Sequence, residues 1–313
     1  MPGTGGNIRV LLGSQGTSKT VKATIALNLL KASFDAAPNY NKKDSPVLTG
    51  TLLKRKNWTS SMSAGGSFSF VLTRDQLIAI LPYLGMEISG TVTTVDTWEP
   101  AASITQWATI GIEHLDADCN FYEIFVGCRF STIKFTLVAE SEIMVDVTFE
   151  SLDYEAPVIN TTTSISTIFT TINEVTDDEL TNLDIAVTAD ASDIADELIS
   201  LDVEISTNLK TDDRSINTLI RRNLDAQDWT ATFTMKTDLL YTTYTAYTAK
   251  AVANTSMDVS VTIGTKIVMS IPEFTPGAPT KPITSRDKVE VTIDGEGFSE
   301  SASSPLSFAI DTA

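Results

Sequence analysis

Apolar and polar side chains alternate along many short stretches of the chain, which is the pattern of a strand with one buried face. In one of these stretches, for example, Ile143, Val145 and Val147 share a face. The clearest alternating stretches are 67–71, 131–137, 143–150, 199–206, 229–235, 257–263, 266–271 and 288–293. Threonine, which favours strands, is frequent in the chain. The pattern therefore predicts that antiparallel sheet dominates the structure.

Signals for helices are few. The stretch 73–81 begins with Thr73 and Asp75, residue types that cap a helix N-terminus, and it ends near Pro82 and Gly85. A weaker, threonine-rich counterpart covers 238–250. Each stretch follows a predicted strand and precedes further β-rich sequence. We therefore expect two short helices, one in each half of the chain.

The order of elements in the first half returns in the second half, which indicates an internal repeat. A basic loop, a strand, a helix and further strands follow one another from Lys54, and the same order starts again at Arg221. Residues 160–178, between the halves, are rich in Thr, Ser and Asn and predict a linker. We predict a mainly β fold of two tandem antiparallel β-sandwich or barrel-like domains, each with a short flanking helix. The expected divisions are an N-terminal arm at 1–40, a first domain at 41–155, a linker at 156–183 and a second domain at 184–313.

The N-terminal region contains an incomplete phosphate-loop motif. A strand-like segment leads into Gly13 and then to Lys19 and Thr20, before a segment with helical character. Ser18 stands where the motif requires a glycine, which lets the backbone approach a phosphate closely. The motif also requires a parallel sheet of alternating strands and helices, which the rest of the chain does not predict. We therefore expect no nucleotide site.

Metal binding and imidazole chemistry have equally little support. Asp116, Asp118 and Asn120 resemble the first ligands of a calcium loop, but Phe121 replaces the glycine of the turn and the glutamate at the end of the loop is missing. His114 is the only histidine, and no cysteine lies at ligand spacing from it. We expect a solvated turn and a surface histidine. The sequence predicts no catalytic residue, no metal site and no cofactor.

The composition is that of a soluble globular protein. The chain has 313 residues, of which 42 % are hydrophobic and 20 % are charged. No apolar run approaches the roughly 20 residues that a membrane-spanning helix needs. The N-terminus lacks the pattern of a secretory signal peptide, so we expect the chain to stay in the cytosol. Cys119 and Cys128 are too few for a disulfide scaffold and are expected to be packed thiols.

The formal net charge of -18 is distributed unevenly. Between Phe135 and Leu209 the chain has seventeen Asp and Glu residues and no Lys or Arg. Nucleic-acid binding gains its affinity mainly from basic side chains that displace counterions. This segment therefore disfavours tight binding of DNA, although it does not oppose the transient passage of DNA.

The basic residues form small clusters in this acidic chain. Two interpretations remain open: the clusters are solvated loops, or they meet acidic surfaces of neighbouring copies and set the register of an assembly. The candidate inter-subunit contacts are Lys42, Lys43, Lys54, Arg55, Lys56, Arg221 and Arg222.

Six segments of the first half form a distinctive set, namely 47–50, 65–70, 75–85, 108–113, 122–130 and 131–137. Together they resemble the tail tube proteins of long-tailed bacteriophages. They include a glycine-led strand, a short helix that ends in Leu-Gly, and a Gly-Cys-Arg sequence that precedes a strand. The second half joins the resemblance only through the repeat. The length of the linker and of the acidic segment departs from the family pattern.

The resemblance implies a β-sandwich flanked by a helix, with a long hairpin or loop that reaches the next ring of subunits. The rings stack into a hollow tube through which the genome travels, and an acidic lumen would let DNA slide without sticking. Strands that pair with the next subunit lose their exposed edges, which favours assembly. Because the halves are similar, three copies could complete a pseudo-sixfold ring, whereas six are needed if only one half lines the lumen.

The resemblance also implies a location in the virion tail after assembly in the host cytoplasm. The implied partners are other copies of the chain and tail proteins such as the tape measure and the tail terminator, with no membrane and no enzymatic activity.

Three alternative functions have distinct signatures. A tail completion or baseplate protein would share the fold but form one ring that does not polymerise. An enzyme built on the N-terminal loop would bind a nucleotide through Lys19. A β-rich adhesin would gather its aromatic residues in one loop, whereas the tryptophans are dispersed, at Trp58, Trp98, Trp107 and Trp229.

Overall fold

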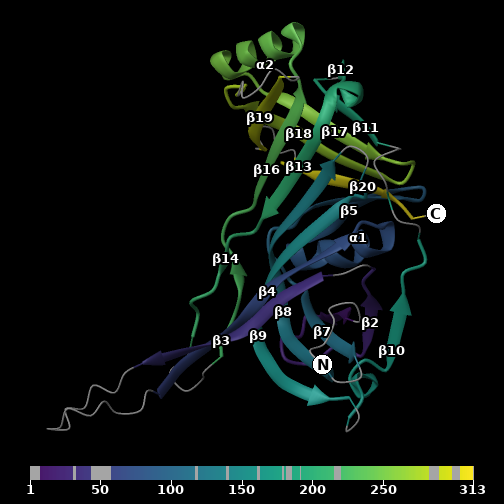
Figure 1. Ribbon diagram of the computed structural model, residues 1–313, viewed down its shortest axis with the longest axis vertical. Coiled ribbons are helices and arrows are strands. Elements are labelled where there is room, and N and C mark those ends of the chain that lie inside the picture. The colour runs from purple at the N-terminus through teal and green to yellow at the C-terminus, as the bar shows by residue number, and fades with distance from the viewer. Residues whose placement is uncertain are drawn as a thin grey trace, which may run out of the picture.

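Strands make up most of the described chain in the computed structural model (Figure 1). The structure describes residues 8–30, 33–43, 58–116, 119–138, 141–160, 163–177, 180, 185–190, 192–214, 220–281, 289–297 and 304–312. The first half contains β1 (Ile8–Gly16), β2 (Ile25–Asn28), β3 (Ser33–Lys43), β4 (Trp58–Val71), α1 (Arg74–Ile80), η1 (Leu81–Leu84), β5 (Met86–Val92), β6 (Val95–Pro100), β7 (Trp107–Asp116), β8 (Cys119–Val138), β9 (Met144–Ile159), η2 (Ile165–Thr167) and β10 (Thr171–Glu174).

The second half contains β11 (Ile185–Ala189), β12 (Ser192–Asp193), η4 (Ala195–Glu197), β13 (Leu198–Ser206), β14 (Leu209–Lys210), β15 (Asp225–Ala226), β16 (Thr230–Asp238), α2 (Tyr241–Ala253), β17 (Met257–Ile263), β18 (Ile267–Pro276), β19 (Glu290–Gly297) and β20 (Ser307–Asp311). The predicted fold class, mainly antiparallel β with a short helix in each half, is confirmed.

The helices begin and end close to the predicted positions. The hydroxyl of Thr73 accepts a hydrogen bond from the amide of Gln76 and so caps α1. The chain continues as a 3₁₀ turn and leaves it at Gly85, whose φ of 85° favours glycine. α2 begins at Tyr241, a little later than predicted, and ends at Asn254 in the left-handed conformation. The predicted strand at 131–137 is the second part of one long strand, β8.

One hydrophobic core extends through both halves. In the second half, the rings of Phe233 and Phe274 pack edge to face with centroids 4.2 Å apart. The ring centroids of Phe135 on β8 and Phe308 on β20 lie 5.6 Å apart, and this contact connects the cores of the two halves. Their burial on strand faces follows the period-two pattern of the sequence.

The pairing of the strands repeats from one half to the other. In the first half β1 pairs with β7, β3 with β4, β4 with β9, β7 with β8 and β8 with β9. In the second half the corresponding pairs are β11 with β17, β13 with β16, β16 with β19, β17 with β18 and β18 with β19. α1 follows β4 just as α2 follows β16. The internal repeat is therefore present in the pairing of these strands, although the β5–β6 hairpin between α1 and β7 has no counterpart between α2 and β17.

The repeat also preserves the register of the strands. Residues 64–71 of β4 oppose 151–144 of β9, and residues 231–238 of β16 oppose 297–290 of β19, with eight pairs in each ladder. Any slip of one residue would turn the buried side chains to the other face. The two halves thus share their side-chain pattern residue by residue in these strands.

The hairpins that lead into these ladders match as well. Ser33 opposes Ser69 and Asn39 opposes Ser63, while Ser200 opposes Lys236 and Ser206 opposes Thr230, at equal sequence intervals. The segment between the paired strands therefore has the same length in both halves. We call residues 40–63 the first arm and residues 207–230 the second arm.

The halves join through continuous strand pairing. β13 of the second half lies between β16 and β8, with Ser200 opposite Val138 and Ser206 opposite Thr132. β20 lies between β18 and β6. Eighteen of the described strands are connected in this way.

The division of the chain into an arm, two domains and a linker remains a prediction. β1, within the predicted N-terminal arm, pairs with β7 over most of its length. Part of the predicted linker packs on the first half, where Ile165 and Phe169 are buried and β10 pairs in parallel with β2. Gly66 on β4 allows β3 to approach closely, because a Cβ at this position would lie only 2.1 Å from the Cβ of Ala36 on β3.

Candidate assembly surfaces

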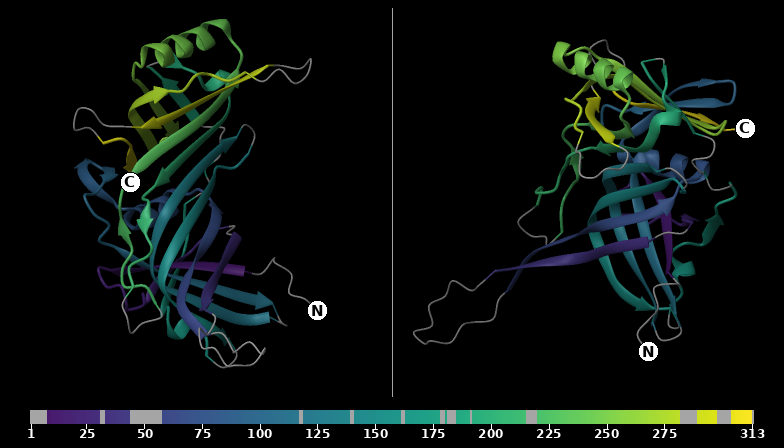
Figure 2. Two further views of the ribbon diagram at one scale, coloured as in Figure 1. Left: turned by 90° about the vertical axis from the view of Figure 1, so that its left-hand side faces the viewer. Right: turned by 45° about the horizontal axis from the view of Figure 1, so that its top comes forward.

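The described base of the first arm, the hairpin of β3 and β4, projects from the body of the protein, as two views show (Figures 1 and 2). The pairing of these two strands continues out to Lys43 opposite Trp58. Lys42 and Lys43 are exposed near the far end of this base. Lys54, Arg55 and Lys56 lie outside the described residues, so their candidate role remains a prediction.

The second arm instead folds back on the first half of its own chain. Arg214 donates a hydrogen bond from Nη1 to the carbonyl of Met62 on β4, at 2.8 Å. Arg221 forms an ion pair with Glu150 on β9, and Arg221 is buried. Arg222 is mostly exposed, with its Nε 3.9 Å from a carboxylate oxygen of Asp213. The structure therefore separates two adjacent candidates into a buried internal contact and an exposed cation.

A buried arginine holds the base of the second arm, and sequence reasoning missed it. Arg129 on β8 donates to the carbonyls of Leu224 and Ile104, and its guanidinium lies 3.7 Å from the centroid of the Trp107 ring. Burial lowers the pKa of Arg129 to about 10, while the charge of Asp225 opposes this effect. The available signal was a lone cation inside the otherwise apolar strand 124–130.

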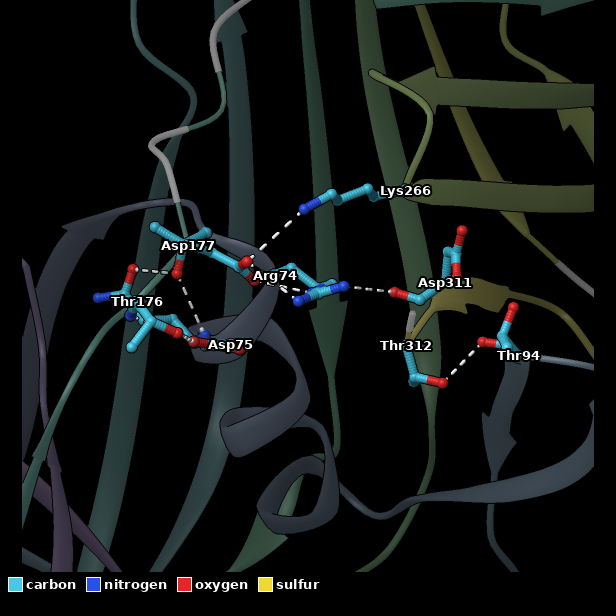
Figure 3. Close-up of polar contacts among 10 residues, drawn as sticks. Arg74, Asp75, Thr94, Thr176, Asp177, Lys266, Asp311 and Thr312 are labelled. Atoms are coloured by element: carbon cyan, nitrogen blue, oxygen red, sulfur yellow. Dashed lines mark hydrogen bonds and ion pairs between the residues drawn. The ribbon is translucent and has the colours of Figure 1, made fainter.

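A polar cluster connects α1 to the second half (Figure 3). Arg74 donates from Nε and Nη2 to the carboxylate of Asp177, at 2.7 Å and 3.0 Å. The same guanidinium donates to the carbonyl of Asp311 at 3.2 Å, and Nζ of Lys266 lies 3.6 Å from Asp177. We call these four residues the junction cluster. Its members come from α1, the predicted linker and two segments of the second half.

The electrostatics of the junction cluster favour the ionised carboxylate. Burial acts to raise the pKa of Asp177, but the hydrogen bond and charge of Arg74, together with Lys266, outweigh it and hold this pKa below its usual value. The side chains of Arg74 and Asp177 are only 15 % and 12 % exposed. The pair is therefore screened by water much less than a surface ion pair.

The N-terminal loop is built as a strand connection. β1 and β2 pair antiparallel, and residues 17–24 between them contain no helix. A Cβ at Gly13 would lie 2.6 Å from the Cβ of Ala23, so the glycine allows the two segments to approach closely. Nζ of Lys19 donates to the carbonyl of Arg222 at 3.0 Å, which ties this loop to the second arm. This arrangement differs from a phosphate loop, in which a helix N-terminus faces the ligand.

The other sequence candidates occupy structural positions. Asp116 and Asn120 lie in the β7–β8 hairpin, and Asp118 falls outside the described residues. His114 is half-buried, and its ring stacks on that of Phe121 with the two centroids 4.2 Å apart. Within the described ranges, no group of three or more His, Cys, Asp or Glu residues could hold a metal ion.

The described cysteine side chain is also a packing residue. Cys128 is a free, fully buried thiol, and burial raises its pKa. Cys119 begins β8, and its side chain lies outside the described set. No helix in the described part of the chain is long and apolar enough to cross a membrane.

The described chain is a duplicated β fold whose halves are joined by continuous strand pairing and whose β3–β4 hairpin projects from the body (Figure 1). The sequence matches the model of a protein family described as phage tail tube proteins over residues 5–297. The match spans both halves, so the chain belongs to the phage tail tube protein family, as the resemblance predicted. It is therefore a structural component of a bacteriophage virion tail. A comparison with curated protein sequences gives no match.

Proposed function

We propose that this chain is the repeating subunit of the tail tube, which self-assembles into stacked rings around a hollow conduit for the genome. The observation that carries the proposal is the repeat, whose two halves share strand pairing and register. Units that are alike in this way can occupy equivalent positions around one axis. The role is structural and non-catalytic.

We further propose that a ring contains three copies, so that six similar halves surround the axis. The β8–β13 pairing within one chain shows how one half can dock on the next. Repetition of this contact between chains would close the ring and cover exposed strand edges. A ring of six copies would instead leave the halves in two unlike environments.

The basic clusters fit contacts between copies. Because the arms are of equal length, Lys54 and Arg55 are the sequence counterparts of Arg221 and Arg222 in the second half. In the matched ladders, Glu296 on β19 takes the place of Glu150 on β9, and Glu296 is exposed. We propose that Lys54 of one copy pairs with Glu296 of a neighbour, as Arg221 pairs with Glu150 within the chain. Lys42 and Lys43, at the far end of the described β3–β4 hairpin, would contact acidic surfaces of neighbouring copies, including those of the next ring.

The strongly acidic character of the chain supports the passage of DNA without tight binding, because a negative surface repels phosphates. Tape measure and tail terminator proteins are proposed as further partners inside and at the end of the tube. We also propose that the tube assembles in the host cytoplasm.

Negative-stain electron microscopy of the purified protein at rising concentration tests this function. We expect hollow tubes, and native mass measurement of released rings should give three times the 33.8 kDa chain mass. Rings that never stack would favour a tail completion or baseplate role. Monomers at every concentration would contradict unaided assembly and favour an adhesin module or a subunit that needs an initiator.

A further inference from the structure

Several strand edges of the described chain lack a pairing partner, and two of them lie in segments that the repeat relates to internal strand pairs. β3 pairs with β4 on one side, and no described strand pairs with its other side. After β18, the chain continues beside β19 as residues 277–281, again with one side unpaired among the described strands. Such edges are templates for pairing with another chain.

The repeat shows which internal edges correspond to these two. The matched hairpins equate residues 33–39 of β3 with 200–206 of β13. The β8–β9 pairing of Lys134 with Asp146 corresponds to the pairing of Thr280 with Thr292, so residues 278–281 correspond to 132–135 of β8. Within the chain, these counterparts pair directly with one another as β13 and β8.

Burial differs between the open edge of β3 and its paired counterpart on β13. Three apolar side chains of β13 are fully buried, namely Leu201, Val203 and Ile205. Their counterparts on β3 are only partly buried, namely Phe34, Ala36 and Pro38. The apolar face of β3 therefore lacks the cover that the repeat gives to β13.

The second open edge shows the same contrast. Ile133 and Phe135 on β8 are buried. Their counterparts beside β19 are Pro279, which is half-buried, and Lys281, which is exposed. The side chains at both open edges are thus less buried than those at the corresponding internal edges.

The backbone of the second edge is oriented outward. Thr280 exchanges two hydrogen bonds of 2.9 Å with Thr292 on β19. In an extended chain, successive peptide groups point to opposite sides, so those of Pro279 and Lys281 point away from β19. Lys281 therefore offers both an N–H and a carbonyl to a strand that adds to this edge, whereas Pro279 offers a carbonyl only.

The orientation of β3 follows from its own proline. A proline fits an edge strand where its nitrogen faces away from the paired neighbour, so Pro38 directs its nitrogen away from β4. Ala36 lies two residues earlier and points to the same side of the strand. The N–H and the carbonyl of Ala36 therefore face the open edge.

We propose that residues 36–39 of one copy add antiparallel to residues 278–281 of the next copy, in the register that places Ala37 opposite Thr280. The inference rests on the proposed ring assembly and specifies its seam. The register copies the internal pairing of Glu204 with Lys134. It places Ala36 opposite Lys281, and this pair exchanges two backbone hydrogen bonds across the seam.

Two prolines face each other in this register and limit its hydrogen bonding. Pro38 lies opposite Pro279, and neither residue has an N–H to donate. The Cδ of each ring takes the space of the missing hydrogen, so this pair exchanges no backbone bond and the strands lie farther apart here than at Ala36. The cover gained by the apolar face of β3 therefore contributes much of the contact.

Disulfide trapping tests the register. Ala37→Cys with Thr280→Cys, in a Cys119→Ser background, places two cysteines directly opposite one another, within the reach of a disulfide. Both native side chains are exposed, so neither substitution disturbs the core. The matched control is Ala37→Cys with Ala278→Cys, a diagonal pair at about 7–8 Å that is too far apart to bridge.

After oxidation of assembled tubes, the matched pair should give covalent species up to the trimer on a non-reducing gel, at least about 5-fold more than the diagonal pair. A mixture of the two single variants should give dimers only, which shows that the bond joins two copies. Normal tubes with equal cross-linking of both pairs would overturn the seam but leave the proposed function intact. Failure of the unmodified protein to form tubes would instead contradict the unaided self-assembly on which the proposed function rests.

Amide hydrogen exchange, measured on the unmodified protein, tests the proposed pairing a second time without any variant. The amides of Ala36 and Lys281 should exchange at least about 10-fold more slowly in tubes than in free subunits, because they gain partners on assembly. The amide of Thr280 is the internal control, since it already has a partner in Thr292. Unchanged exchange at both Ala36 and Lys281 in regular tubes would contradict the proposed pairing.

Discussion

The junction cluster provides a quantitative test of how the two halves are held together. Asp177→Asn keeps the shape of the side chain but removes its charge, and it leaves the guanidinium of Arg74 without its carboxylate. An ion pair that is broken by removing one partner costs about 3–5 kcal/mol when fully buried. An exposed pair contributes about 0–1 kcal/mol. With side chains 15 % and 12 % exposed, we expect a loss of about 2–3 kcal/mol in the free energy of unfolding.

Urea unfolding at pH 7, followed by circular dichroism, measures this loss. For a slope of about 3 kcal/mol per M, the midpoint should fall by about 0.7–1 M. The matched control is Asp213→Asn, which removes the half-buried carboxylate beside the mostly exposed Arg222, 3.9 Å away, and should cost less than about 1 kcal/mol. Equal losses in the two variants would refute the view that the junction cluster is a buried structural contact.

The pH dependence gives the sign of the effect. The pKa of Asp177 lies lower in the folded protein than the value of about 3.9 expected in the unfolded chain. Its ionised form therefore stabilises the fold fully above that unfolded value, and this stability disappears as the pH falls through the folded pKa. The difference between the wild type and Asp177→Asn should stay constant from about pH 7 to 5 and shrink below about pH 4. A full difference that persists well below the folded pKa would refute the assignment.

Three further predictions concern the arms and the core. Leu224→Ala should lower the free energy of unfolding by about 2–4 kcal/mol in urea titrations, because Leu224 is fully buried in a cluster with Trp107; a loss below about 1 kcal/mol would contradict that packing. In a Cys119→Ser background, a thiol reagent should label Cys128 only after unfolding, since the thiol is buried and its pKa is raised; rapid labelling of the folded protein would show an open core. Lys54→Glu should reduce the mass of tubes that sediment, and adding Glu296→Lys should restore it, whereas no rescue would contradict the proposed ion pair.

Much of the fold follows from local sequence patterns. The alternation of Ile143, Val145 and Val147 predicts the buried face of β9, and the same three side chains are buried in the structure. Thr73 and Gly85 predict the beginning and the end of the first helical segment because capping and left-handed turns depend on neighbouring residues only. The same signals, read twice along the chain, also predicted the internal repeat.

The roles of the basic clusters could not be read in the same way. Arg221 and Lys54 occupy equivalent positions in arms of equal length, yet Arg221 is buried against Glu150 in its own chain. This contact depends on which half lies beside the second arm, and that is decided by the pairing of β13 with β8. Arg129 was missed for a related reason. Its structural role depends on the carbonyls that accept its hydrogen bonds, and these belong to residues distant in the sequence.

The sequence by itself determined the class of fold, the two helices, the duplication and the resemblance to phage tail tube proteins. These features depend on periodicity and on short-range chemistry, which remain visible in a linear chain. Only the tertiary structure decided the matched registers, the strand that joins the halves and the two edges that are left open. The two-residue alternation of apolar and polar side chains indicates which face of a strand is buried, but it does not indicate which strand lies beside it. The neighbouring strand and its register depend on long-range packing.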